Sequence, residues 1–162
     1  MGSYPYGKPD VCTWVRENFP RGSVLLDVGA CDGKWRELLP EYTMDAVEIF
    51  EPYARNLKGY RNVFVMDVAG LEYDWYDLVI FGDVVEHMTV EQAQTVLEYA
   101  KGHCRDMVVA VPWLYEQGEV DGNKWQAHLQ SDLTPEIFAE RYPGFAVLVD
   151  PGNGYCYYHK KP

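Results

Sequence analysis

Short apolar runs alternate with amphipathic stretches along the whole chain, and this alternation constrains the fold more than any other feature of the sequence. Each run has five or six residues, is rich in Val, Ile, Leu or Phe, and is bounded by Gly, Pro, Asp or Asn. This pattern is typical of buried, mostly parallel strands. The runs are residues 23–28, 44–49, 62–66, 77–81, 107–111 and 145–149.

The stretches between these runs predict helices over residues 9–19, 34–39, 51–57, 89–100 and 134–141. Thr89 and Gln92 match a capping box, in which each side chain bonds to the backbone of the other residue. Thr134 followed by Pro135 gives a second N-terminal cap. Strands that alternate with helices predict an α/β fold in which helices cover both faces of a parallel sheet.

The end of the chain departs from this pattern. Residues 145–150 and 155–160 are expected to be strands, with only the four residues 151–154 between them. No crossover helix fits in that space, so the two strands predict an antiparallel hairpin. We expect residues 1–162 to form one domain, in which the long loop 112–132 serves as a lid or binding segment.

The charge balance excludes several classes of partner. The net charge of −11, from 14 Lys and Arg against 25 Asp and Glu, argues against nucleic acid and anionic membranes, since no basic stripe offsets it. No apolar run approaches the ~20 residues that span a bilayer. Residues 1–10 lack the apolar core of a signal peptide, and Cys12, Cys31, Cys104 and Cys156 have neither paired nor zinc-binding spacing. We therefore expect reduced thiols and a cytoplasmic location.

A glycine turn joins the first predicted strand to the next helix, in the sequence Asp27-Val28-Gly29-Ala30-Cys31-Asp32-Gly33-Lys34. Such a turn lets backbone N–H groups approach a ligand at the positive end of a helix. The dinucleotide fingerprint needs glycines at relative positions 1, 3 and 6, of which only Gly29 fits. A spacing of 1, 3 and 5 fits both Gly29 and Gly33, with Asp27 before them. This second spacing resembles motif I of the class I S-adenosylmethionine-dependent methyltransferases.

Four further features extend this resemblance over nearly the whole chain. Glu48 ends the second strand, 21 residues after Asp27, and Asp67 ends the third strand. Residues 76–88 look like the family's fourth motif, and the terminal hairpin is similar to the family's closing feature. Taken singly, a glycine turn often only connects a strand to a helix, and a carboxylate at a strand end is often solvated. Their joint spacing, however, favours cofactor binding. The resemblance implies a Rossmann-like fold with a mostly parallel seven-stranded sheet, and S-adenosylmethionine as cofactor.

The resemblance also implies a set of cofactor-binding residues. They are Asp27, Gly29, Ala30, Cys31, Gly33, Glu48, Ile49, Asp67, Val68, Gly82 and Asp83. The glycine turn would contact the methionine part of the cofactor, and Glu48 would bind the ribose. Asp67 and the Val68 N–H would bind the adenine edge, and Ile49 would pack on the adenine. Cys31 stands where the middle glycine is expected, and a small side chain fits there if φ stays negative.

Asp83, Glu86 and His87 follow the fourth strand, at the edge where doubly wound folds bind ligands. If residues 83–87 make one helical turn, Asp83 faces the other two side chains, and the group could bind Mg²⁺ or Mn²⁺. This cluster is similar to the metal-binding acid-x-x-Glu-His cluster of the ubiquinone-pathway catechol O-methyltransferases and the small-RNA 2′-O-methyltransferases. His128 could be a fourth ligand from the long loop. Two other interpretations stay open: His87, with these neighbours, as a general base or acceptor contact, and a purely structural role.

Aromatic side chains in loops could enclose the substrate. Trp113 and Tyr115 follow the fifth strand, beside the expected methyl donor, where they could stack on a planar acceptor. The alternative is that these rings only fold the long loop onto the domain. Tyr4 and Tyr6 could cover the cofactor as part of an N-terminal flap and helix over residues 1–20.

Together these features predict a methyltransferase that uses S-adenosylmethionine to methylate an O or N atom of a small-molecule acceptor, as a monomer or a homodimer. A protein side chain is the second class of acceptor, and neither nucleic acid nor a membrane is expected as a partner. The alternatives are a catalytically silent adenosyl-binding module or partner subunit, and a nicotinamide-type oxidoreductase, against which the glycine spacing argues.

Overall fold

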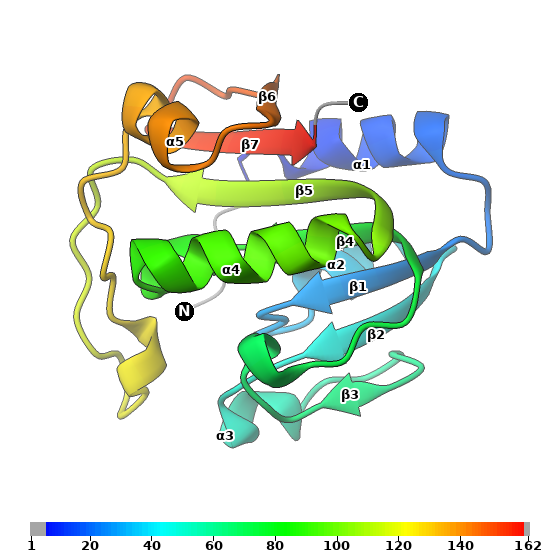
Figure 1. The fold of residues 1–162 in the computed structure, drawn as a ribbon. Helices are drawn as coiled ribbons and strands as arrows, with labels where there is room; N and C mark the ends of the chain where they lie inside the picture. The colour runs from blue at the N-terminus through cyan, green and yellow to red at the C-terminus, as the bar shows by residue number, and fades with distance from the viewer. Residues whose placement is uncertain (1–5, 161–162) are drawn as a thin grey trace.

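The structure, a computed structural model, describes residues 6–160 and is built around a seven-stranded sheet (Figure 1). The strands lie in the order β3-β2-β1-β4-β5-β7-β6, and β7 is antiparallel to both of its neighbours. The remaining neighbours pair in parallel, so the predicted sheet with an antiparallel terminal hairpin is confirmed. Their bounds are β1 Val24–Val28, β2 Thr43–Val47, β3 Val63–Phe64, β4 Tyr76–Gly82, β5 Cys104–Pro112, β6 Phe145–Val149 and β7 Tyr155–Lys160. Tyr4 of the expected flap lies outside the described residues.

Five α-helices lie within residues 6–160. They are α1 Lys8–Asn18, α2 Lys34–Leu38, α3 Glu51–Ala54, α4 Val90–Lys101 and α5 Pro135–Arg141, with short 3₁₀ helices η1 Val68–Gly70, η2 Val85–His87 and η3 Lys124–Gln126. Gln92 N–H donates to Thr89 Oγ1 at 3.2 Å and Thr89 N–H donates to Gln92 Oε1 at 3.0 Å, which confirms the capping box. Thr134 caps α5 in the predicted way. Within the described part of the chain, none of the helices is both long and apolar enough to cross a membrane.

Successive strand side chains point to opposite faces of the sheet, and each face is covered by its own helices. In β4, Leu78 and Ile80 pack in a buried cluster with residues of α1 and α2. Val79 and Phe81 pack in a second cluster with residues of α4 and α5. Figure 1 shows α4 lying along the face turned toward the viewer. With both faces covered, the ends of the strands are the part of the sheet that stays free to form a site.

Two elements are shorter than the sequence predicts. The strand expected over residues 62–66 is limited to the two residues of β3, an edge strand that pairs only with β2. Beyond it the chain turns into η1, whose first turn is capped by Asp67 through a bond from Ala69 N–H at 2.9 Å. The helix expected over residues 51–57 ends at Ala54, and the chain then passes through Gly59, at φ +79°, before it reaches β3.

Two carboxylates are buried within the sheet and differ in their partners. Asp45 accepts bonds from Arg61 and Tyr76, and these bonds together lower its pKa although burial works to raise it. Asp27 is 1% exposed, and Tyr60 OH donates to its Oδ2 at 2.6 Å. Its Oδ1 has no hydrogen-bond partner within residues 6–160. Burial raises the pKa of Asp27 to about 7, and the bond from Tyr60 opposes this rise only in part.

The raised pKa of Asp27 makes stability depend on pH. Because the folded chain binds this proton more tightly than the unfolded chain, the free energy of unfolding falls as pH rises from the ordinary carboxyl pKa of 3.8 toward about 7. Asp27→Asn removes the titration while leaving an oxygen to accept from Tyr60. We expect the variant to exceed the native protein in stability by up to roughly 4 kcal/mol at pH 8, and to lose that advantage near pH 4.

Urea denaturation at a series of pH values measures this difference directly. Asp74→Asn is the matched control, because Asp74 is exposed in the loop before β4 and the same chemical change there should leave the pH profile of the native protein unchanged. Parallel profiles for the native protein and the Asp27 variant would contradict the prediction.

Candidate active site

The carboxyl ends of β1, β2, β4 and β5 border a cavity of about 850 Å³. The cavity lies where the strand order reverses between β1 and β4, which is the place where open α/β sheets bind ligands. Residues 113–134 connect β5 to α5, and residues 113–132 of this connection, which we call the lid, supply much of the cavity lining. Figure 1 shows the lid, with η3 at its far end, running along the carboxyl edge of the sheet toward α3.

The glycine turn after β1 requires glycine at two positions. Gly29 has a φ of +71°, and a Cβ atom there would lie 2.5 Å from Val84 Cγ2. Gly33, at φ +79°, caps the N-terminus of α2. Both positions are in the left-handed region that glycine adopts without strain, so the two glycines that match the methyltransferase spacing have a direct conformational reason.

The condition under which a small side chain fits at Cys31, a negative φ, is not met. Cys31 has a φ of +47°, in the left-handed region that favours glycine. Its N–H donates to Glu48 Oε2 at 2.9 Å, and this charge-assisted bond is what holds the strained residue in place. Burial raises the pKa of the Cys31 thiol to about 11, so the side chain is a neutral thiol at physiological pH.

Glu48 joins the ends of β1 and β2. It is 5% exposed, and its Oε1 accepts from Phe50 N–H at 2.8 Å while its Oε2 binds the turn at Cys31. Burial raises the pKa of Glu48 and the backbone bonds oppose this rise. Each carboxylate oxygen has a second lone pair, so Glu48 can still accept hydrogen bonds from a ligand in the cavity.

The predicted cofactor residues do not all reach the cavity. Those that line it are Gly29, Ala30, Cys31, Glu48, Ile49, Asp67, Val68, Gly82 and Asp83. Asp27 is buried behind the turn against Tyr60, and Gly33 lies at the start of α2. Their roles toward a cofactor remain predictions, but nine of the eleven residues line one cavity.

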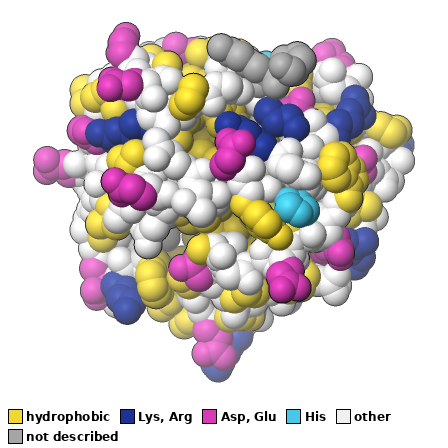
Figure 2. All heavy atoms as spheres, in the orientation of Figure 1, with side chains coloured by type: hydrophobic (Ala, Val, Ile, Leu, Met, Phe, Trp, Pro, Cys, Tyr) yellow, Lys and Arg dark blue, Asp and Glu magenta, His cyan; other side chains and the backbone are white. Residues whose placement is uncertain are grey.

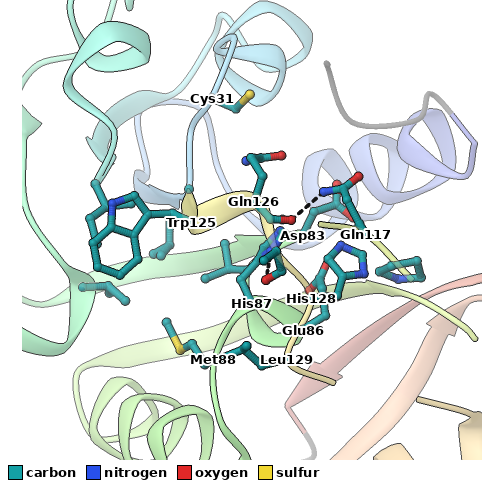
Figure 3. Close-up of a pocket in the computed structure, with 18 of the residues that line it drawn as sticks. Cys31, Asp83, Glu86, His87, Met88, Gln117, Trp125, Gln126, His128 and Leu129 are labelled. Atoms are coloured by element: carbon teal, nitrogen blue, oxygen red, sulfur yellow. Dashed lines mark hydrogen bonds between the residues drawn. The ribbon is translucent and has the colours of Figure 1, made fainter. Parts of the chain in front are cut away.

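A second group of polar side chains lies on the other side of the cavity. Glu86, His87 and His128 each offer a ligand atom, and these atoms all lie within 4.8 Å of one another. Figure 3 shows this cluster gathered together, with Trp125 on the opposite side of the pocket. Glu86 is 1% exposed, and neither of its carboxylate oxygens has a hydrogen-bond partner among the described residues. Burial, together with the charge of Asp83, raises the pKa of Glu86 well above its usual range.

The two histidines are fixed in one tautomer. His87 Nδ1 lies 3.2 Å from Ala127 O, and His128 Nδ1 lies 2.8 Å from Tyr115 O. A carbonyl oxygen can only accept, so each Nδ1 carries the hydrogen and each Nε2 keeps a free lone pair. Burial lowers the pKa of both rings, which keeps them neutral. A neutral imidazole whose Nδ1 is bonded to a carbonyl is the usual arrangement of a metal-binding histidine.

Asp83 does not complete this cluster in the expected way. The condition that residues 83–87 make one helical turn is not met, because Asp83 has a φ of +58° and η2 begins only at Val85. The carboxyl group of Asp83 instead accepts a hydrogen bond from Tyr155 OH of β7. It is therefore not among the mutually close ligand atoms of Glu86, His87 and His128, although it still lines the cavity.

Sequence reasoning missed Tyr155 and Gln130. Tyr155 is buried at the start of β7, and burial and the charge of Asp83 raise its pKa well above the usual range. Its partner is 72 residues away, so only the register of β7 against β5 reveals the contact. Gln130 follows His128 by two residues and is almost fully buried, whereas its sequence context is that of an ordinary polar loop residue.

Aromatic side chains do line the cavity. Trp113, Tyr115 and Trp125 are in its wall, together with the half-exposed Tyr6 of the N-terminal segment. Tyr115 also packs edge-on against His128, with 5.4 Å between ring centroids. The rings therefore both shape the lid and face the space where an acceptor would lie, so the two interpretations of these residues are compatible.

Comparison with known proteins gives matches at the level of structure alone. No family model matches the sequence, and no curated protein does so either. An S-adenosylmethionine-dependent methyltransferase from Clostridium acetobutylicum superposes with a TM-score of 0.73 at 12% identity, covering 98% of this chain and 92% of that one.

Two further solved structures show the same likeness. The 1,6-didemethyltoxoflavin-N1-methyltransferase of Burkholderia thailandensis has a TM-score of 0.65 at 17% identity, over 94% of this chain and 77% of that one. The magnesium protoporphyrin IX methyltransferase of Synechocystis has a TM-score of 0.67 at 14% identity, over 95% of this chain and 77% of that one. At these identities the likeness establishes the architecture: the chain has the fold of the class I S-adenosylmethionine-dependent methyltransferases.

Proposed function

We propose that this protein transfers a methyl group from S-adenosylmethionine to an oxygen or nitrogen atom of a small-molecule acceptor. The observation that carries the proposal is that the glycine turn, Glu48 and Asp67 line the same cavity at the carboxyl edge of the sheet. The Burkholderia structure holds S-adenosylhomocysteine and the Synechocystis structure holds S-adenosylmethionine, which supports the same cofactor for this chain.

The residues that would bind the cofactor offer polar and apolar contacts that suit its methionine, ribose and adenine parts in turn. The backbone N–H groups of the glycine turn would face the methionine part, and Glu48 would accept the ribose hydroxyl protons. Ile49 and Val68 supply apolar surface for the adenine ring, and the carboxylate of Asp67 lies beside them for its amino group. We infer that the opposite wall, with the cluster and the lid, is left for the acceptor.

A small acceptor fits the size and charge of the site. The cavity volume of about 850 Å³ is within the ~300–1,000 Å³ usual for sites that enclose small ligands, and part of it would hold the cofactor. Acidic and basic side chains are interspersed on the face drawn in Figure 2, without the continuous basic stripe that a nucleic acid would need. The aromatic rings of the lid favour an acceptor with a planar or apolar body.

Catalysis would rest mainly on positioning, since methyl transfer needs in-line attack of the acceptor atom on the methyl carbon. Asp83 is held by Tyr155 at the boundary between the two walls, where it can orient a polar group of the acceptor. The free Nε2 atoms of His87 and His128 can accept the proton that leaves the attacking atom.

The cluster also fits a divalent cation such as Mg²⁺ or Mn²⁺. A buried carboxylate without a partner is costly, and a carboxylate oxygen of Glu86 lies within 4.8 Å of a ring nitrogen of both His87 and His128. We infer that Glu86, His87 and His128 would hold the ion. When bound, it would supply Lewis-acid chemistry that lowers the pKa of an acceptor hydroxyl group.

Calorimetric titration with S-adenosylhomocysteine tests the cofactor site, with NADH as the control ligand. Glu48→Ala removes charge-assisted hydrogen bonds worth about 1.5–3 kcal/mol, so we expect affinity for S-adenosylhomocysteine to fall roughly 10- to 100-fold. Glu51→Ala is the matched control, because Glu51 is exposed at the start of α3 and forms a solvent-exposed ion pair with Arg55. Its loss should leave the affinity unchanged.

Three outcomes separate the candidate functions. Binding of S-adenosylhomocysteine but not NADH, followed by turnover in an acceptor screen, supports methyl transfer. Binding without turnover on any acceptor favours a silent adenosyl-binding module. Binding of NADH alone would contradict the proposal and favour an oxidoreductase.

Thermal unfolding after treatment with EDTA tests the cation. A ligand at 100 times its Kd stabilises the folded state by about 2.7 kcal/mol, so we expect Mn²⁺ to raise the Tm of the native protein by several degrees. Glu86→Gln should abolish this rise, whereas Glu91→Gln, an exposed glutamate in the first turn of α4, should retain it. If Mn²⁺ changes the Tm of the native protein and of the Glu86 variant by the same amount, the cluster does not bind the ion. His87 and His128 would then act as bases without a metal ion.

A further inference from the structure

Gln130 has a side-chain amide in which every hydrogen-bonding position is used. It is 3% exposed, and its Nε2 donates to Val85 O at 2.9 Å and to Met88 O at 3.1 Å. Its Oε1 accepts from Tyr142 OH at 2.7 Å and from Arg141 Nη1 at 3.2 Å. A buried amide with both hydrogens and both lone pairs engaged has one orientation.

The two carbonyl groups that Gln130 binds flank Glu86 and His87. These two residues lie on η2, a single 3₁₀ turn. Within the turn, the backbone bonds run from His87 N–H to Val84 O and from Met88 N–H to Val85 O, at 3.1 and 3.2 Å. So short a turn gives little support of its own, and the amide of Gln130 braces it at both ends.

The backbone next to Gln130 fixes the third member of the cluster. Glu86 O accepts from both Leu129 N–H, at 2.8 Å, and Gln130 N–H, at 3.0 Å. His128 is the residue immediately before this pair of bonds, so its position is tied to the backbone of Glu86. Figure 3 shows Leu129 and His128 beside Glu86 and His87.

The far side of the amide is anchored to α5. Arg141 forms a two-point ion pair with Asp132, with N–O distances of 2.8 and 2.5 Å, and Tyr142 is buried. Gln130 therefore connects the C-terminal end of α5 to the η2 turn and to the end of the lid. An apolar residue of the same size would leave two buried carbonyl groups and a buried hydroxyl group without these bonds.

We propose that Gln130 is a positioning residue for the divalent cation, because it sets the spacing of Glu86, His87 and His128. This inference rests on the proposed function, which places the ion on those three side chains. The competing explanation is that Gln130 only joins the lid to α5. If Gln130 is a positioning residue, its substitution weakens the affinity for the cation alone. If Gln130 is only structural, its substitution weakens the affinities for the cation and for S-adenosylhomocysteine equally.

Gln130→Met keeps the length of the side chain and removes its four hydrogen bonds. Residues that orient metal ligands usually change metal affinity about 10- to 100-fold when they are replaced, so we expect Mn²⁺ binding to weaken by that factor. Affinity for S-adenosylhomocysteine should stay within about twofold, since the residues proposed to bind it lie on the other wall. Free Mn²⁺ measured by electron paramagnetic resonance and calorimetry with S-adenosylhomocysteine give the two affinities.

Gln94→Met is the matched control. Gln94 also uses its amide to bind α5, donating to Arg141 O at 2.9 Å, but it has no bond to η2 or the lid among the described residues. It should leave both affinities within about twofold of the native values. Tyr142→Phe, which removes one bond to Gln130 Oε1 and keeps the ring, serves if Gln130→Met does not fold; we expect it to weaken Mn²⁺ binding more than binding of S-adenosylhomocysteine.

The results that would overturn the inference are distinct from failure of the proposed function. Native affinity for Mn²⁺ in Gln130→Met, or equal losses of both affinities in the variant that folds, would show that Gln130 is only structural. A native protein that binds no Mn²⁺ would overturn this inference and the proposed cation together, while S-adenosylhomocysteine binding would still report on the cofactor site.

Discussion

The parallel pairing of β1 with β2 and β4 is the constraint on which the site depends. Val28 of β1 lies opposite the last residue of β2 on one side and Phe81 of β4 on the other. The residues that follow, Gly29, Glu48 and Gly82, therefore leave the sheet at nearly the same level. The register of the paired strands thus brings residues that are far apart in the sequence to one edge of the sheet. The helices on both faces leave that edge open.

The same edge contains the least favourable residues of the fold. Cys31 and Asp83 have positive φ values, and Asp27 and Glu86 are carboxyl groups whose pKa is raised by burial. Each of these features costs stability, and the closely packed clusters on both faces of the sheet are what offset the cost. Strained backbone and buried carboxyl groups concentrate where a ligand would bind. These unfavourable features therefore indicate the site independently of any sequence motif.

Most of the fold could be predicted from local sequence signals, whereas the contacts within the site could not. Strand runs, the cap at Thr89 and the four-residue connection before β7 are each encoded within a few neighbouring residues. The φ of Cys31 depends on a bond to Glu48 from another strand, and Asp83 binds Tyr155 instead of joining a helical turn. The role of Gln130 likewise depends on η2 and α5, which are distant in sequence. Candidate site residues were therefore identifiable by type and spacing, but their partners required the three-dimensional structure.

The charge of the cavity wall distinguishes between the two classes of cofactor that the glycine turn allows. Burial raises the pKa of Glu48 and Glu86, which means that their surroundings supply too little positive charge to compensate an ionised carboxylate. A dinucleotide would add a pyrophosphate to this wall, and α2 is only five residues long, too short to supply much compensating dipole. The sulfonium of S-adenosylmethionine adds positive charge instead, and so would a divalent cation.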